Sequence, residues 1–285
     1  LLAAAPPAVI GYRMLLSESD ARLKDNINKL THIIRNDIVY RVRLPVQPTL
    51  SAMAHGILPE CRTVEERWRF LPLLAALLNN YAVISGLFIG YDNGEYFMVR
   101  RLDTGEEMGI YNPPSASRFV GSRISHEGGR TKHEHYFYNA ESELILQRPS
   151  EIAQGFDPRT RPWYQEAMRV GEQVEISPIM NSSGLPVMMF AEKSYGGRSV
   201  VGIDITLRDL SAILYRELPS PGSHLALLRP DGVMIARARG IVVQNNGETR
   251  LSTLEDASPV LRLAAQAYNE SRSDQVFRLN HEGED

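Results

Sequence analysis

The chain has 285 residues, of which 43% are apolar and 23% charged, and its formal net charge is −3. This composition is ordinary for a globular protein with one large core or two smaller ones. The small net charge provides no basic excess for a phosphate backbone, so we expect no nucleic-acid partner. Cys61 is the single cysteine, which excludes a disulfide framework and a zinc site built on cysteine pairs.

Residues 1–16, LLAAAPPAVIGYRMLL, carry one charge, at Arg13. They are shorter than the about 20 apolar residues that a membrane-spanning helix needs. We interpret them as the end of a transmembrane segment, with the apolar part of a signal peptide or a buried helix as alternatives. The last residues, RLNHEGED, stop where a hairpin turn is expected, so we expect the chain to be a fragment of a longer protein.

The first predicted helix covers residues 17–43 and opens an N-terminal helical stalk over residues 17–81. Apolar residues recur along this helix every three or four positions and form one stripe. They are Leu23, Ile27, Leu30, Ile34 and Ile38. Pro45 and Pro48 are expected to end the helix. The stripe either covers one face of the domain or pairs with a second copy of the chain, so a homodimer is an open alternative.

The second predicted helix, residues 63–81, starts with Thr63 and Glu66 at the spacing of a capping box. Two β-rich runs then surround the turn residues 92–94, which predicts a hairpin over residues 82–101. Further strands are predicted at residues 132–140, 186–194 and 199–207, followed by a helix at 208–218. This order predicts an α+β domain around an antiparallel sheet.

A shorter version of the same pattern follows a predicted linker at residues 220–223. Residues 224–238 form strand, Asp-Gly turn and strand, and residues 256–270 are predicted to be helical. We therefore predict two related modules in series, residues 82–219 and a second, incomplete module over residues 220–285.

The segment 155–165, GFDPRTRPWYQ, contains one glycine and two prolines, which make it a rigid bend unsuited to a helix. In an extended bend, Arg161 and Trp163 point to the same side. They offer a guanidinium group, an indole N–H and an apolar ring face. Such a set suits a small ligand with a carboxylate and an apolar or cationic remainder. The alternative is plain stacking of arginine on tryptophan, with Asp157 paired to Arg159.

The nine residues FDPRTRPWY (156–164) resemble the signature of double Cache domains, the extracytoplasmic sensors of bacterial transmembrane receptors. The resemblance extends over roughly residues 17–285 and includes the strand VVGIDITLRDL. It implies two PAS-like modules, with a ligand pocket on one face of the membrane-distal sheet. It also implies flanking membrane helices, a location in the periplasm or outside the cell, and a cytoplasmic output domain. Nucleotide cyclases, histidine kinases, diguanylate cyclases and chemotaxis modules all remain open as outputs.

In the amino-acid sensors of this family, the arginine and tryptophan of the signature hold the ligand carboxylate. The following tyrosine and an aspartate late in the module hold the ammonium group. The resemblance assigns these roles to Arg161, Trp163, Tyr164 and Asp204. Strand alternation also predicts that Asp204 points away from the face of its two isoleucine neighbours.

Two positions depart from that pattern, because Phe156 and Ile179 (or Met180) stand where those sensors carry tyrosines. We therefore expect the pocket to hold an anion, and its ligand to be an amino acid, an amine or a small carboxylate. The alternative is a sensor module with a degenerate pocket that acts through a partner protein or through dimerisation.

The residues give little support for catalysis or for a cofactor. His133 and His135 lie on one face of a predicted strand and could bind a metal, but no third ligand is evident, so we interpret them as the exposed polar face of an edge strand. His55 does not establish a nucleophile pair with Cys61. No nucleophile elbow, P-loop or dinucleotide-binding glycine motif is present. We expect this fragment not to be an enzyme, whereas the full-length protein is open to a cyclase or kinase domain.

Overall fold

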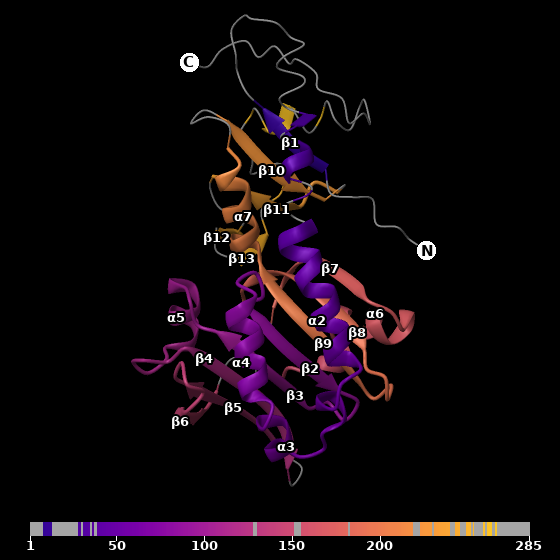
Figure 1. Cartoon of the computed structure of the whole chain (residues 1–285), viewed down its shortest axis with the longest axis vertical. Helices are drawn as coiled ribbons and strands as arrows, with labels where there is room; N and C mark the ends of the chain where they lie inside the picture. Colours follow the sequence, from indigo (N-terminus) through magenta and orange to yellow (C-terminus); the bar gives the residue numbers. More distant parts are fainter. Residues whose placement is uncertain are drawn as a thin grey trace, which may run out of the picture. The chain divides into compact units, whose positions relative to one another are not determined.

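The computed structural model describes most of the central part of the chain. The described residues are 8–12, 28–29, 31–34, 36, 39–127, 130–150, 155–181, 183–218, 223–229, 231–239, 243–245, 249–251, 253, 259, 261–263 and 266. They form two compact units (Figure 1). The larger unit is Arg43–Thr206, and the smaller unit combines described residues from 1–42 and 207–285.

An eight-stranded sheet forms the centre of the larger unit (Figure 1). Its strands are β2 (Gly86–Tyr91), β3 (Tyr96–Arg101), β4 (Phe119–Glu127), β5 (Arg130–Tyr138), β6 (Leu144–Pro149), β7 (Val174–Met180), β8 (Pro186–Lys193) and β9 (Ser199–Thr206). Their spatial order is β6-β5-β4-β3-β2-β9-β8-β7, and every neighbouring pair is antiparallel. Because β2 pairs with both β3 and β9, residues far apart in the sequence meet at the centre of the sheet.

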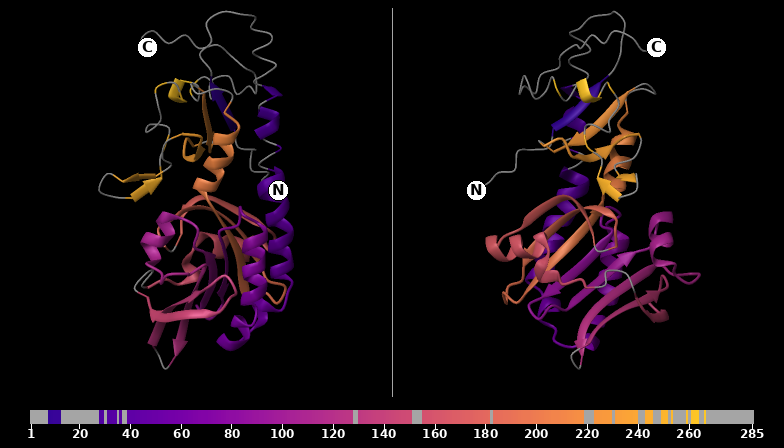
Figure 2. Two further views of the ribbon diagram at one scale, coloured as in Figure 1. Left: turned by 60° about the vertical axis from the view of Figure 1, so that its left-hand side comes forward. Right: turned by 180° about the vertical axis from the view of Figure 1, so that it is seen from behind.

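Helices from the N-terminal part of this unit cover one face of the sheet (Figure 2). They are α2 (Leu44–Ala54), α3 (Val64–Trp68) and α4 (Leu71–Asn80). Trp68 packs against Phe97 with ring centroids 4.8 Å apart. Its indole also occupies the space above Gly121, where a methyl group would overlap the ring. Ile203 and Ile205 of β9 are fully buried, as expected of a sheet face under helices.

The opposite face is covered by α5 (Gly105–Tyr111), a short 3-10 helix (Pro158–Thr160) and α6 (Pro162–Val170). A core cluster of aromatic and apolar side chains lies on this face, and Phe88 and Tyr111 belong to it. The ring of Phe88 on β2 lies over Gly202 on β9, where a side chain would overlap it. This is the face on which the signature segment packs.

The smaller unit has its own sheet, made of β1 (Ala8–Tyr12), β10 (His224–Leu228) and β11 (Met234–Arg237). The order is β1-β10-β11, and both pairings are antiparallel. Helix α7 (Leu207–Arg216) contacts β10 and β11. Two further strands, β12 (Val243–Asn245) and β13 (Thr249–Leu251), pair only with each other among the described residues.

The α+β class with antiparallel sheets, predicted from the sequence, is confirmed. The hairpin around residues 92–94, the later strands, the helix after β9 and the Asp-Gly hairpin of the smaller unit all form where they were predicted. The capping box of Thr63 and Glu66 is present at the start of α3. Of residues 256–270, the described ones are helical, and most of the predicted linker at 220–223 lies outside the described residues.

The prolines at positions 45 and 48 do not end the first predicted helix. The described residues between 28 and 43 are helical, a π-helical turn spans Val39–Arg43, and α2 continues to Ala54. Pro45 lies in the first turn of α2, where its missing N–H has no partner within the helix. Residues 17–27 of the predicted helix lie outside the described residues.

The predicted helix 63–81 is divided into α3 and α4, because Pro72 stands in the first turn of α4 and interrupts the hydrogen-bond ladder before it. These helices belong to the larger compact unit instead of forming a separate stalk. The units divide between Thr206 and Leu207 and not at residues 219–220, since α7 contacts the strands that follow it.

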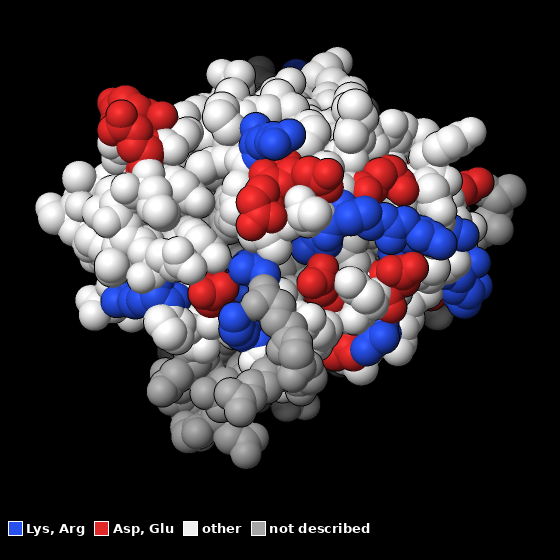
Figure 3. All heavy atoms as spheres, turned by 90° about the horizontal axis from the view of Figure 1, so that it is seen from below, with Lys and Arg blue, Asp and Glu red and all other residues white. Residues whose placement is uncertain are grey.

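Residues Ala8–Tyr12, which the sequence suggested as part of a membrane segment, form β1 and pair with β10. Among the described residues, none of the helices has the length and apolar composition that a membrane crossing requires. Figure 3 shows acidic and basic side chains interspersed on the face seen from below the view of Figure 1.

The packing of Trp68 on Gly121 gives a stability prediction for the larger unit. Gly121→Ala is expected to destabilise it by about 1–3 kcal/mol, because the added methyl group overlaps the packed ring of Trp68. Gly109→Ala on α5 is the matched control, since nothing lies within 4 Å of the new methyl group. It is expected to stabilise the unit by about 0.4–1 kcal/mol. Urea denaturation measures both, and equal stability of the two variants contradicts the packing described.

Candidate functional site

The signature segment is a turn followed by helix, and not the extended bend predicted from its prolines. Gly155 adopts a positive φ of 72°, which explains a glycine at this position. The Asp157 side chain accepts a hydrogen bond from the backbone N–H of Arg159 at 2.9 Å and caps the short 3-10 helix. Pro162 occupies the first turn of α6, where proline is favourable, and Arg161 is the N-cap residue.

Arg159 and Arg161 have different environments within this segment. The guanidinium group of Arg159 is ion-paired to Asp157, with Nη2 and Oδ2 2.7 Å apart. That of Arg161 lies over the ring of Phe156, 4.5 Å from its centroid. The Nε atom of Arg161 is buried without a hydrogen-bond acceptor, and no carboxylate of a described residue pairs with this side chain. Arg161 therefore has a free capacity to bind an anion.

The aromatic residues of the signature pack directly on β2. Trp163 lies against Phe88 and Tyr164, with ring centroids 4.9 Å and 5.7 Å away. A Cβ atom at Gly90 would lie 2.7 Å from the Trp163 ring, so this glycine permits the close approach. Trp163 and Tyr164 are both buried, and burial raises the pKa of the Tyr164 hydroxyl.

The two positions that depart from the amino-acid sensors also join this cluster. Phe156 packs on Tyr96 with ring centroids 4.9 Å apart, while its ring also faces Arg161. Ile179 on β7 is partly buried against the same core cluster. An apolar ring at position 156 therefore forms the surface under the Arg161 guanidinium group.

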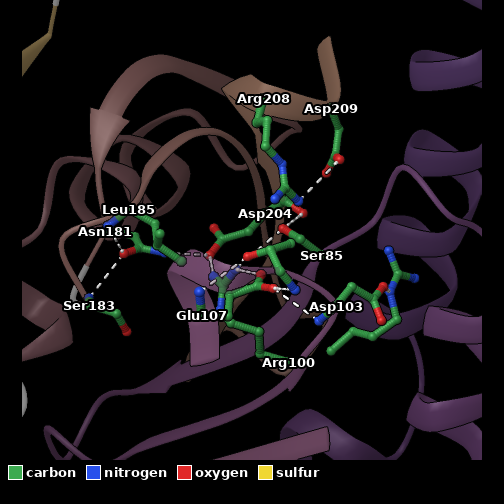
Figure 4. Close-up of polar contacts among 12 residues, drawn as sticks. Ser85, Arg100, Asp103, Glu107, Asn181, Ser183, Leu185, Asp204, Arg208 and Asp209 are labelled. Carbon is green, nitrogen blue, oxygen red and sulfur yellow. Dashed lines mark hydrogen bonds and ion pairs between the residues drawn. The ribbon is translucent and has the colours of Figure 1, made fainter. Parts of the chain in front are cut away.

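Asp204 lies on the site face of β9, opposite in direction to Ile203 and Ile205, as strand alternation predicted. It does not contact the signature residues, and is instead ion-paired with Arg100 of β3 (Figure 4). Gly86 of β2 is in register with both Arg100 and Asp204. A Cβ atom at Gly86 would lie 3.1 Å from Nη2 of Arg100, so the guanidinium group crosses the sheet over this glycine.

The remaining polar contacts of the ion pair come from neighbouring elements (Figure 4). Nη1 of Arg100 donates to Oγ of Ser85 at 3.3 Å, and that hydroxyl donates to the backbone oxygen of Asp204 at 2.9 Å. Nδ2 of Asn181 lies 3.4 Å from Oδ2 of Asp204. Burial raises the pKa of Asp204, while Arg100 and Asn181 oppose the rise. Burial opposes the charge of Arg100 too, but the carboxylates around it raise its pKa.

The structure thus groups five of the six predicted site residues around the signature segment: Phe156, Arg161, Trp163, Tyr164 and, at the margin of the cluster, Ile179. Asp204 shares their sheet face but has other partners. Sequence reasoning missed Arg100, Gly86 and Asn181. The only signal for Arg100 was the pair of arginines, Arg100 and Arg101, at the end of a strand that is otherwise apolar and aromatic.

The alternative catalytic and metal residues form no such site. His135 is buried against Tyr111, with ring centroids 5.2 Å apart, and β5 is an inner strand and not the exposed edge strand considered from the sequence. Within the described part of the chain, no group of three or more His, Cys, Asp and Glu side chains is arranged to hold a metal ion. The Cys61 thiol donates to the backbone oxygen of Ile57 at 3.6 Å, and burial raises its pKa.

Solved structures with the same architecture are sensory domains. The sensory domain of the Campylobacter jejuni chemoreceptor Tlp3 superposes with a TM-score of 0.53 at 16% identity, over 91% of this chain and 84% of that one. The same domain in complex with L-valine gives a TM-score of 0.51 at 16% identity, over 87% and 78%. The chain therefore shares the fold of this sensory domain, in agreement with the resemblance to double Cache domains. No family model matches the sequence.

Two curated proteins are similar in sequence to parts of this chain. Adenylate cyclase 1 of Rhizobium meliloti is 31% identical over 137 residues, which are 47% of this chain and 20% of the cyclase. The methyl-accepting chemotaxis protein McpB of Bacillus subtilis is 36% identical over 74 residues, which are 25% of this chain and 11% of McpB. The similarity therefore spans at most about a fifth of either relative.

The buried ion pair leads to a stability prediction. Asp204→Asn removes the nearer counter-charge of the buried Arg100 guanidinium group and leaves it only Glu107, 3.9 Å away, so it is expected to destabilise the larger unit by about 3–5 kcal/mol. Glu175→Gln is the control within the same unit, because it breaks the partly exposed pair with Arg43 and is expected to change stability by at most about 1 kcal/mol. Chemical denaturation compares the two. A loss for Asp204→Asn no larger than that for the control contradicts a charged buried pair.

The buried His135 predicts a dependence of stability on pH. Burial lowers its pKa from an ordinary value near 6.5 to about 3, and His133 adds to the shift. The unfolded chain binds a proton that the folded chain does not bind, so stability falls as the pH drops from about 6.5 toward 3, by up to about 1.4 kcal/mol per unit. In His135→Gln this contribution to the slope is absent, whereas the exposed His126→Gln retains it. Denaturation at several pH values tests this, and equal slopes in both variants contradict it.

Proposed function

We propose that this chain is the extracytoplasmic sensing region of a bacterial transmembrane receptor. It binds a small molecule on the site face of the larger unit and signals to a cytoplasmic output domain. The double Cache fold, shared with the Tlp3 sensory domain, supports the sensory role. The sequence similarity to an adenylate cyclase and to a chemotaxis protein supports attachment to a signalling output, such as a cyclase, kinase or chemotaxis module. The fragment itself is then the receptor part and not the enzyme.

The observation that carries this proposal is the state of Arg161. Its guanidinium group is half-buried over an aromatic ring and has no carboxylate partner among the described residues. A half-buried charge of this kind is stabilised by an anion that supplies paired acceptors. The indole N–H of Trp163 and the hydroxyl of Tyr164 belong to the next turn of the same segment. We therefore assign the ligand carboxylate to Arg161, with Trp163 and Tyr164 beside it.

The ligand class follows from charge and surface together. Arg161 favours an anionic group, whereas Phe156 and Ile179 add apolar surface in place of hydroxyl groups. We assign Asp204, a buried carboxylate on the same sheet face, as the second polar group of the proposed pocket. Amino acids, amines and small carboxylates are thus the classes to test.

Signalling requires that the ligand bind one state of the receptor more tightly than the other. The free energy available is limited to that difference, which is about 1–3 kcal/mol for typical coupled sites. A membrane anchor on each side of the sensing region, which the family resemblance implies, is the route by which this difference reaches the cytoplasm.

A second candidate function is a module with a degenerate pocket that senses a partner protein or its own dimerisation. The burial of Phe156, Trp163 and Tyr164 within one core cluster favours it, because aromatic side chains then occupy the place of a ligand. The two functions differ in one respect: only the first requires the charge of Arg161.

The test is a thermal-shift screen of the 285-residue chain against amino acids, amines and small carboxylates, followed by calorimetry on each hit. Arg161→Ala is expected to weaken binding about 10- to 100-fold, because a hydrogen bond to a charged group contributes about 1.5–3 kcal/mol. The matched control is Arg169→Ala on the same helix, whose exposed side chain pairs with Glu166 and is expected to leave binding unchanged.

Two results count against a carboxylate site at Arg161. One is a ligand that binds wild type and Arg161→Ala equally. The other is the absence of a thermal shift with all three ligand classes, which favours the partner-sensing alternative. The next experiment is then a pull-down with the purified chain.

A further inference from the structure

Asp204 already has a counter-charge, which changes what this carboxylate offers to a ligand. Both partners of the pair are buried, with 1% of Asp204 and 0% of Arg100 exposed. Nη2 of Arg100 donates to Oδ2 of Asp204 (Figure 4). The guanidinium group crosses Gly86 on the strand between them. An ammonium group brought to this position loses its hydration and meets the like charge of Arg100.

Glu107, the other carboxylate near Arg100, does not restore a site for a cation. Its Oε1 lies 3.9 Å from Nη1 of Arg100. Its Oε2 accepts hydrogen bonds at 3.1 Å from the backbone N–H groups of Asp103 and Thr104, which directly precede α5. The charge of Glu107 is therefore held by the start of its own helix and by Arg100.

One carboxylate oxygen of Asp204, Oδ1, lacks a hydrogen-bond donor among the described residues. Arg100 and Asn181 both approach Oδ2, whereas Oδ1 is buried and accepts no hydrogen bond from any described residue. A buried polar atom without a partner is unfavourable, so a ligand group that donates to Oδ1 gains free energy. A hydroxyl group supplies such a donor without adding a charge.

We infer that the site selects a small carboxylate that carries an uncharged hydrogen-bond donor, of which a 2-hydroxy acid is the simplest example. This rests on the proposed function, in which Arg161 holds the carboxylate. The hydroxyl group then donates to Oδ1 of Asp204 while Arg100 stays on Oδ2. Arg100 is the residue that determines this specificity, because it occupies the position beside Asp204 that a ligand ammonium group requires.

The experiment compares three acids that differ only at the second carbon. The methyl series is lactate, alanine and propionate. The isopropyl series is 2-hydroxy-3-methylbutanoate, valine and 3-methylbutanoate. Calorimetry with the wild-type 285-residue chain is expected to give the highest affinity for the hydroxy acid, a lower one for the plain acid and the lowest for the amino acid, within the series that binds. The hydroxy acid is expected to bind about threefold to tenfold more tightly than the plain acid. It is expected to bind at least about tenfold more tightly than the amino acid.

Arg100→Gln removes the internal cation and retains an amide that can donate to Asp204. In this variant the amino acid is expected to become the tightest ligand of its series, because Asp204 then lacks a counter-charge. The double variant Arg100→Gln, Asp204→Asn removes both charges and is expected to bind the hydroxy acid and the plain acid without a gain for the amino acid. Circular dichroism verifies that each variant is folded. If a variant is unfolded, the order of affinities measured with the wild-type chain tests the inference by itself.

The outcomes separate this inference from the proposed function. If the wild-type chain binds the amino acid most tightly and Arg161→Ala abolishes binding, the inference is wrong but the proposed sensor function stands. Equal affinity for the hydroxy acid and the plain acid also overturns it, since Oδ1 then receives no donor. If no acid binds detectably, both the proposed carboxylate site and the inference are wrong.

Discussion

The buried ion pair between Arg100 and Asp204 is the constraint on which the site face depends. It joins β3 to β9 across Gly86, so the two charges also fix the register of three central strands. Two opposite charges lose hydration on burial and remain stable only when each has well-placed partners. The contacts from Ser85 and Asn181 meet part of that need. The sheet therefore carries a polar row within a face that is otherwise aromatic and apolar.

The two faces of the sheet therefore differ in the side chains that they carry. The face under α2, α3 and α4 is a conventional core, where Trp68 on Gly121 fixes the helices to the sheet. The opposite face keeps ionisable groups, and the signature segment places Arg161 there with its guanidinium group over Phe156. Such a division suits the proposed sensor role, because one face supplies stability and the other retains polar groups that a ligand can pair with.

The sequence was informative where a single strand or turn determined the outcome. Alternation around Asp204 predicted its direction, and the spacing of Thr63 and Glu66 predicted a capping box that is present. The prolines of the signature were misleading, because Pro162 starts α6 and does not prevent it. Arg100 was not predicted, since one sequence does not reveal that β2 lies between β3 and β9. The partner of Asp204 depends on that strand order and on the glycine that lets a long side chain cross.

The measurement that tests the central claim most directly is a crystal structure of the chain grown with 2-hydroxy-3-methylbutanoate, since the position of Arg100 decides how Asp204 acts. Our account predicts the ligand carboxylate on the guanidinium group of Arg161, its hydroxyl on Oδ1 of Asp204, and Arg100 still paired to Oδ2. A ligand bound elsewhere, or an Arg100 side chain that has left Asp204 to bind the carboxylate itself, would contradict it.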